Sequence, residues 1–286
     1  MLSEYYKNPS GKINYSHSKT NKYHGMDFHL HEYFEIYFFI SGKVNYFIEN
    51  KVYQLHYGDL IFMNNQEIHK PSVFPGEAYE RIVIHFDSSI VGLLSPDDFN
   101  LLDCFINRPK GEFNRINLDN EQSNHILEFL YKIGQLQKSV SAGSSIIKLT
   151  AFLDLLVYIN RIYNAMQKNC DYSDIPEKLR LIMDYIDKNA EENLSLDALG
   201  KKFFIDKYYL SRLFKKYTGS NIHDYILYKR ISKAKRVLSE GYSATEASAV
   251  CGFNDYSNFY RMFKKTVGVS PSRYKKKVNF ELQNPF

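Results

Sequence analysis

Hydrophobic and polar residues follow two different spacings along this chain. Between about residues 25 and 90, runs at residues 34–40, 43–48 and 81–86 are rich in aromatic and β-branched residues. Glycines separate these runs, at Gly42, Gly58 and Gly76. Several short runs bounded by turn residues predict a β-barrel or β-sandwich. Beyond residue 119 the apolar residues instead recur every three or four positions, which predicts helices.

Two long helices are predicted directly after the strands, at residues 119–140 and 144–168. Their apolar stripes comprise Leu127, Leu130 and Leu136 in the first helix and Ile146, Leu149, Leu153, Leu156 and Ile159 in the second. Such stripes either cover the helices' own domain or form a dimer seam, and the pattern alone leaves both open. Residues 168–176 are polar and end at Pro176, so we expect a linker there.

Two stretches that begin 49 residues apart, at residues 206–219 and 255–268, repeat one pattern. Each begins with an aspartate, Asp206 or Asp255, which can cap the first free backbone N–H groups of a helix. Each ends with a glycine, Gly219 or Gly268, which suits the left-handed residue that follows a helix. Because one apolar stripe at helical spacing joins these ends, the repeat predicts the same short helix twice.

The face opposite that stripe is polar, basic and aromatic in both copies. It carries Lys207, Tyr208, Ser211, Arg212 and Lys215 in the first copy and Tyr256, Ser257, Asn258, Arg261 and Lys264 in the second. Side chains of these kinds can contact base edges while neutralising phosphates. We therefore expect both faces to bind double-stranded DNA.

A short predicted helix and a tight turn precede each copy, at residues 195–203 and 243–250. Ser243 and Glu246 have the spacing of a capping box. A helix, a turn and a second, polar helix make a helix-turn-helix, whose second helix enters the major groove. The alternative is that both repeats are amphipathic helices of a bundle.

Charge favours the DNA-binding interpretation. Residues 201–286 hold 18 Lys and Arg against six Asp and Glu, a net charge of +12 in a chain whose total is +5, so residues 1–200 carry −7. A basic domain attracts DNA because it displaces counterions from the phosphates. Membrane surfaces and RNA also attract basic segments, but neither explains two spaced helix-turn-helix units.

Residues 176–277 resemble the DNA-binding domain of the AraC/XylS family of bacterial transcription regulators. The resemblance rests on residues 209–219, 230–234, 252–253, 259–264 and 268–271, and on Tyr274. It implies a long helix at about residues 222–239 that holds the two recognition helices in adjacent major grooves, about 34 Å apart. Its buried seam would be Leu227, Ile231, Ala234 and Leu238. Base contacts would fall to Tyr208, Ser211 and Arg212, and to Tyr256, Ser257, Asn258 and Arg261.

The chain departs from the family where the first helix of each motif packs. The family has Ala at the position of Gly200, and Ile, Ile and Ala at the positions of Ala244, Ala247 and Ser248. Smaller residues thin the core of both motifs, that of the second more. We therefore expect the second helix-turn-helix to be the less stable and to contribute less to specificity.

The N-terminal strands resemble the cupin jelly roll. His29, His31 and Glu35 have the spacing of the first cupin motif, and Gly58 precedes His69 at the spacing of the second. In metal-binding cupins the positions of these three histidines and the glutamate hold a divalent metal ion.

The second cupin motif departs from the cupin pattern at Asn64 and Gln66. Cupins joined to this DNA-binding domain usually bind an effector and no metal. Three interpretations stay open: an effector pocket without a cofactor, a metal sensor or metal-dependent enzyme fused to a DNA-binding domain, and histidines that make ordinary hydrogen bonds. We favour the first, a protein that is not an enzyme.

Period-two alternation places side chains of two strands on shared faces. These are Glu35, Tyr37, Phe39 and Ser41 on one strand and Tyr79, Arg81, Val83 and His85 on another. A barrel interior with such groups suits a hydroxylated ligand such as a sugar. The predicted effector site comprises His29, His31, Glu35, Tyr37, His69, Arg81 and His85. A register slip by one residue would turn the strand residues outward.

Residues 1–24 contain Tyr5, Tyr6, Tyr15 and Tyr23 and would either close the effector pocket as an arm or form a loose tail. The chain has no apolar run of 18 residues and no charged-then-apolar leader, so we expect a cytoplasmic protein without a membrane span. Cys104, Cys170 and Cys251 lack metal or disulfide spacing, and no glycine-rich phosphate loop is present.

Together these features predict an α+β chain of two domains. A cupin-like effector domain would span residues 1–118, a helical linker or dimerisation region residues 119–168, and an all-α domain with two helix-turn-helix motifs residues 169–286. The family resemblance implies a sequence-specific transcription regulator, an activator rather than a repressor, that binds promoter DNA and a small molecule. It also implies contact with RNA polymerase and homodimerisation, so of the two roles for the stripes at residues 119–140 and 144–168 we favour the dimer seam.

Overall fold

The computed structural model describes residues 12–21, 23, 26–74, 76, 78–92, 99–139, 141–166 and 175–283. The chain forms two compact units: residues 1–25, 32–65 and 73–173 belong to the first, and residues 26–31, 66–72 and 174–286 to the second. Of the predicted linker at residues 168–176, only Ile175 and Pro176 lie within the described residues. The domain boundaries at residues 118 and 168 stay predictions.

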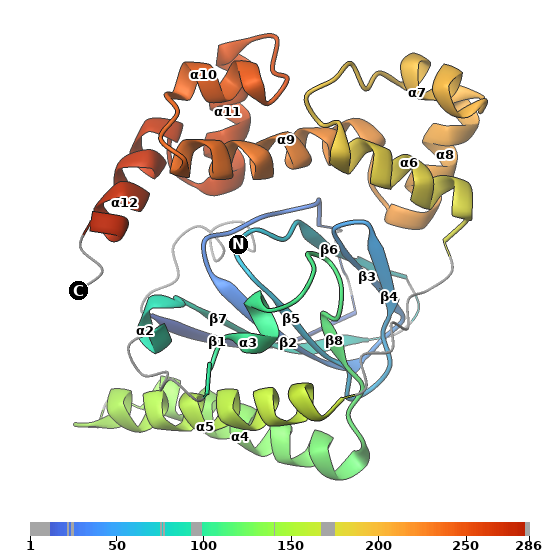
Figure 1. Cartoon of the computed structure of the whole chain (residues 1–286). Coiled ribbons are helices and arrows are strands. Elements are labelled where there is room, and N and C mark those ends of the chain that lie inside the picture. Colours follow the sequence, from blue (N-terminus) through green and yellow to red (C-terminus); the bar gives the residue numbers. More distant parts are fainter. Residues whose placement is uncertain are drawn as a thin grey trace. The chain divides into compact units, whose positions relative to one another are not determined.

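The N-terminal strands form two sheets (Figure 1). The larger sheet has five strands, in the spatial order β1 (Ile13–Thr20), β7 (Tyr79–Phe86), β2 (Phe34–Ser41), β5 (Leu60–Met63) and β8 (Arg115–Ile116). The order β4-β3-β6 describes a three-stranded sheet of β4 (Lys51–Gln54), β3 (Val44–Ile48) and β6 (His69–Val73). Among the described residues the strand pairs of the larger sheet are antiparallel, so its two faces can meet different surroundings.

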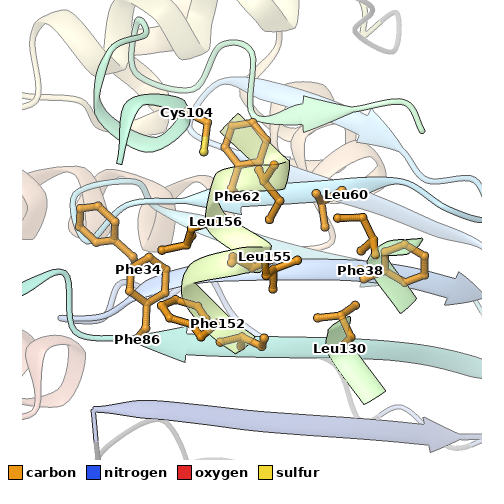
Figure 2. Packing of buried hydrophobic residues seen from close by; sticks show 14 of the residues in the cluster. Phe34, Phe38, Leu60, Phe62, Phe86, Cys104, Leu130, Phe152, Leu155 and Leu156 are labelled. Atoms are coloured by element: carbon orange, nitrogen blue, oxygen red, sulfur yellow. The ribbon is translucent and has the colours of Figure 1, made fainter. Parts of the chain in front are cut away.

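One face of the larger sheet is covered by helices of the same unit. These are α4 (Asn120–Lys138), α5 (Ser144–Ala165) and the shorter α2 (Ser89–Gly92) and α3 (Asp103–Ile106). Figure 2 shows phenylalanines of the strands, among them Phe34 and Phe86, meeting Phe152 and Leu155 of α5. Full burial of one such side chain contributes about 1.5–3 kcal/mol, so this layer stabilises the unit strongly.

The apolar stripes of α4 and α5 belong to this core. Leu130, Leu156 and Ile159 are fully buried in it, and Leu127, Leu136, Leu149 and Leu153 pack against it. Of the predicted stripes only Ile146 is largely exposed, at 67%. The two helices therefore cover their own domain with these stripes, the alternative to the favoured dimer seam. Homodimerisation itself stays a prediction.

Part of the predicted arm or tail at residues 1–24 belongs to the larger sheet. Residues 13–20 form β1, which pairs along its whole length with β7. Tyr15 and Gln137 of α4 exchange two hydrogen bonds. The backbone N–H of Tyr15 donates to Gln137 Oε1 over 2.9 Å, and Gln137 Nε2 donates to the backbone oxygen of Tyr15 over 3.0 Å. Tyr15 is thus part of the sheet, whereas Tyr5 and Tyr6 lie outside the described residues.

The described residues of the C-terminal region are helical. Its helices are α6 (Glu177–Lys188), α7 (Leu196–Phe203), α8 (Lys207–Thr218), α9 (Ile222–Ser239), α10 (Ala244–Val250), α11 (Tyr256–Val267) and α12 (Pro271–Gln283). The long helix α9 has the predicted bounds, and its four predicted seam residues are buried. The predicted fold class is confirmed: cupin-like strands followed by helices, then an all-α domain with two helix-turn-helix motifs joined by α9.

Candidate DNA-binding surface and effector site

Both recognition helices begin and end at the residues that the repeat predicts. The carboxylate of Asp206 accepts a hydrogen bond from the backbone N–H of Tyr209 over 2.8 Å. The carboxylate of Asp255 accepts two, from Ser257 over 3.1 Å and from Asn258 over 2.9 Å. Left-handed glycines follow the helices, Gly219 with φ 68° and Gly268 with φ 85°. Local sequence therefore sets the length of α8 and of α11.

The outward face of α8 carries the predicted DNA-binding residues. Arg212 and Lys215 are exposed, Ser211 is half-buried, and Tyr208 is 68% exposed. Lys207 is engaged within the chain, because its ammonium donates to the carboxylate of Asp197 on α7 over 2.7 Å. That hydrogen bond raises the pKa of Lys207 and lowers the pKa of Asp197.

The outward face of α11 has the same character. Tyr256, Ser257, Arg261 and Lys264 are exposed, and Asn258 is half-buried. The opposite face is buried against α9, where Phe259 and Phe263 join the core. Each recognition helix thus combines a buried apolar face with an exposed basic and polar one, which is what major-groove contact requires.

On the second face of β2 and β7, the polar side chains of Glu35, Arg81 and His85 are buried beside apolar ones such as Phe39 and Val83. The register sets Glu35 opposite His85 and Phe39 opposite Arg81. His85 Nε2 lies 2.9 Å from one carboxylate oxygen of Glu35, and the hydroxyl of Tyr46 donates to the other over 3.2 Å. Glu35 and His85, which period-two alternation sets on the two predicted strand faces, are thus in contact in one interior.

Tyrosines continue this interior. The hydroxyls of Tyr37 and Tyr79 lie 2.8 Å apart, and the Arg81 guanidinium lies over the Tyr79 ring, 4.3 Å from its centroid. Burial raises the pKa of Tyr37, and the Tyr79 hydroxyl raises it further, so Tyr37 stays protonated and able to donate. Tyr46 and Tyr79, which the predicted site omitted as ligand contacts, belong to the same network.

The three histidines of the cupin motifs come together within the second compact unit. The ligand atoms of His29, His31 and His69 lie within 4.8 Å of one another. Backbone carbonyls accept from the Nδ1 atoms of two rings, Glu67 O from His69 over 2.8 Å and Asp27 O from His29 over 3.2 Å. Because a carbonyl can only accept, Nδ1 carries the proton in both rings, and in the neutral rings Nε2 carries the lone pair.

Comparison with known proteins assigns both regions. Residues 15–145 match the model of the AraC-like ligand binding domain, and residues 199–277 match that of a helix-turn-helix domain. This chain belongs to the AraC family of transcription regulators. Its two matched regions are the ligand-binding domain and the helix-turn-helix domain of that family.

Curated relatives of this AraC-family chain are regulators too. The uncharacterized HTH-type transcriptional regulator YijO of Escherichia coli (strain K12) is 34% identical over 103 residues, 35% of this chain and 36% of that protein. YbfI of Bacillus subtilis (strain 168), also an uncharacterized HTH-type transcriptional regulator, is 24% identical over 234 residues, 80% of each. The matches to YijO, LumQ and PocR span only 36%, 41% and 34% of those proteins.

Among solved structures, ToxT from Vibrio cholerae O395 aligns with 93% of this AraC-family chain and 98% of its own, at 14% identity and a TM-score of 0.38. No helix among the described residues is both long and apolar enough to span a membrane.

Gly200, where the AraC family has Ala, has a local structural reason. A Cβ on Gly200 would lie 2.9 Å from the backbone oxygen of Ile205, so the close turn after α7 needs a glycine. In the second motif Ala247 is fully buried at a position where the family has the larger Ile. The smaller core of the second motif is therefore an observed feature, whereas its lower stability stays a prediction.

The turn before α8 contains a residue that the sequence pattern did not single out. Phe204 has a left-handed backbone, with φ 50°, and its side chain is 91% exposed. Only the left-handed region admits this turn, and it disfavours residues with a side chain. Phe204 lies at the end of α7, three residues before α8 begins, so the turn that leads into the recognition helix exposes an aromatic side chain. The sequence signal for this exposed residue was the pair Phe203 and Phe204, because a tight turn can bury only one of two adjacent side chains.

Proposed function

We propose that this AraC-family regulator is an activator that binds promoter DNA in two successive major grooves and responds to a small hydroxylated molecule, for which a sugar is our first choice. The two capped recognition helices, each with an exposed arginine and lysine on its outer face, carry the DNA-binding part of the proposal. The buried carboxylate, imidazole and hydroxyls of the strand region support the effector part, because such groups hold hydroxyls by hydrogen bonds.

The effector acts by changing populations. A ligand shifts the balance between DNA-binding arrangements only to the extent that it binds them with different affinity. The proposal therefore requires that DNA affinity or promoter output change when the strand-region site is filled. We further propose that the protein works as a homodimer in the cytoplasm and contacts RNA polymerase there. It would need no catalytic residue.

The first test combines site selection on random DNA with thermal shift of the full chain against mono- and disaccharides. We expect one selected sequence to bind well above random DNA. We also expect one sugar to raise thermal stability, by roughly 2.7 kcal/mol at 100 times its dissociation constant. Equal affinity for selected and random DNA would contradict sequence-specific regulation. A sugar that binds without changing DNA affinity or transcription would contradict its role as effector.

A metal sensor is the second candidate, and the clustered cupin-motif residues favour it. Three imidazoles and one carboxylate suit a divalent transition metal, and the carbonyl partners of His29 and His69 keep Nδ1 protonated, so a metal ion would be bound through Nε2. His29, His31, Glu35 and His69 would hold the ion. When bound, the ion would lock these four side chains together.

Titration with Zn²⁺, Ni²⁺ and Mn²⁺, followed by calorimetry and elemental analysis, tests the metal candidate. It predicts one ion per chain, lost in His69→Ala and retained in His56→Ala, whose side chain is 73% exposed. Binding that survives His69→Ala would place the metal elsewhere and remove this candidate.

A further inference from the structure

Three tyrosines from separate parts of the first compact unit meet beside Arg81. This tyrosine cluster consists of Tyr23, Tyr37 and Tyr79. Tyr37 and Tyr79 are almost fully buried, with exposures of 2% and 1%, and Arg81 is 7% exposed. Their contacts form one continuous group, since Tyr79 touches the other three: its hydroxyl meets Tyr37, its ring meets the edge of Tyr23 at 5.3 Å, and Arg81 stacks on it.

The hydroxyl of Tyr23 is the unusual member of the cluster. It is buried, yet it has no hydrogen-bond partner among the described residues. A buried hydroxyl without a partner destabilises a fold, so an unpaired one in a native structure points to something that binds there. The Tyr23 residue as a whole is half-buried, so part of it borders the solvent.

A positive charge reaches that hydroxyl. Burial raises the pKa of Tyr23, the neighbouring Tyr79 hydroxyl raises it further, and the Arg81 guanidinium lowers it. Tyr23 is therefore a protonated donor, and the charge that acts on it is cationic. Donors and a guanidinium at one place match an anionic acceptor with several lone pairs, and a carboxylate is the common small-molecule group of that kind.

We propose that Tyr23, Tyr37, Tyr79 and Arg81 form a subsite for a carboxylate group, so that the effector is a sugar acid and not a neutral sugar. The inference deepens the proposed function and rests on it. Hydroxyls of the same ligand meet the adjoining polar groups: Tyr37 and Tyr46 rings are in contact at 4.8 Å, and the Tyr46 hydroxyl leads to Glu35 and His85. The Arg81 guanidinium would bind the ligand's carboxylate and the Glu35 carboxylate would accept from its hydroxyls, so the ligand would bind in one orientation.

Matched ligand pairs test the carboxylate directly. Calorimetry on the full chain would compare glucuronate with glucose, galacturonate with galactose, and gluconate with sorbitol. We expect the acid of at least one pair to bind at least tenfold more tightly than its neutral partner. A neutral member that binds as tightly as its acid, or a panel in which no acid binds, would overturn the sugar-acid assignment.

Variants then separate binding from folding. Arg81→Gln should abolish the preference for the acid over its neutral partner, whereas Arg161→Gln, on the exposed surface of α5, should leave it unchanged. Tyr23→Phe should weaken acid binding about fivefold to tenfold while the ligand-free protein melts no lower, because the variant removes an unsatisfied hydroxyl. If Tyr23→Phe instead lowers the ligand-free melting temperature and leaves acid binding intact, Tyr23 is structural and the subsite is refuted.

DNA binding in the same samples keeps the two proposals apart. Fluorescence anisotropy with the selected DNA site measures the regulator function without an effector. Retained sequence-specific DNA binding with no acid preference would overturn the sugar-acid subsite alone. Loss of sequence-specific DNA binding in the unmodified chain would overturn the proposed function.

Discussion

The two helix-turn-helix motifs share a recognition helix of one design but differ in the turn that leads into it. α8 and α11 have the same length, the same aspartate cap and the same left-handed glycine behind them. Before α8, the left-handed turn residue is Phe204, which is almost fully exposed. Before α11 it is Gly252, whose Cα lies against the backbone of Glu191. The ends of these helices are set by residues next to them in the sequence, whereas the conformation of each turn depends on the segments that pack against it.

This difference makes the two turns unequal in what they tolerate. The first turn opens to solvent, so a large side chain fits there despite a strained backbone. The second turn packs against the segment before α7, so it ties the second motif to the first. The second motif therefore depends on a glycine for its placement as well as for its own conformation.

The largest expected effect follows from Gly252→Ala. A Cβ there would lie 2.5 Å from the backbone oxygen of Glu191, at a residue with φ 78°. Because both the conformation and the contact with rigid backbone oppose a side chain, the free energy of unfolding should fall by about 2–5 kcal/mol. Urea denaturation measures it.

Gly268→Ala is the matched control for that change. Gly268 has φ 85°, but no atom lies within 4 Å of an added Cβ. The control should lose only the conformational part, about 1–2 kcal/mol. Equal losses for Gly252→Ala and Gly268→Ala would show that the contact with Glu191 contributes nothing and that the two turns are alike in tolerance.

The next effect concerns DNA. Arg212→Ala should weaken binding to the selected site by about 1–3 kcal/mol and relax specificity at one base pair, since an arginine reads guanine by two hydrogen bonds. Arg261→Ala should weaken binding less, because the second motif has the smaller core. Anisotropy titrations on the selected site and on single-base variants compare them. A larger loss from Arg261→Ala would reverse the predicted ranking of the two motifs.

Much of the C-terminal region could be predicted from its residues because its signals are local. Each of these signals spans only a few positions of the sequence. They are the helix caps, the capping box at Ser243 and Glu246, and the apolar stripes of α8, α9 and α11. The open turn at Phe204 and the close approach of Gly252 to Glu191 could not be read in this way. They depend on contacts between segments that are distant in sequence.

In the N-terminal region, period-two alternation was enough to put Glu35, Tyr37, Arg81 and His85 on one interior face. It could not show that Tyr46 bonds Glu35 or that Tyr23 reaches Tyr79, because both contacts join different strands or segments. The apolar stripes of α4 and α5 were equally ambiguous in sequence. A leucine stripe has the same spacing whether it meets a sheet of its own chain or a second copy.

A smaller effect is expected from the aspartate caps at the N-termini of α8 and α11. Asp206→Ala and Asp255→Ala should each lower the free energy of unfolding by about 0.5–2 kcal/mol, and Asp255→Ala should lower it more because its carboxylate caps two N–H groups instead of one. Asp→Asn at each position keeps an accepting oxygen and serves as the control. If the alanine variants lose nothing relative to the asparagine variants, the caps do not stabilise these helices.

The smallest effect separates charge from base reading. Lys215→Ala should weaken selected and random DNA alike, by about threefold, and reduce the slope of log affinity against log salt by about 0.9, because one phosphate contact releases about one counterion. Lys264→Ala should do the same, since both lysines lie at the same position of the repeat and are exposed. Salt series of anisotropy titrations measure both slopes. A loss confined to the selected site would mean that the lysine reads a base, and unequal slopes would mean that the two recognition helices lie at different depths in their grooves.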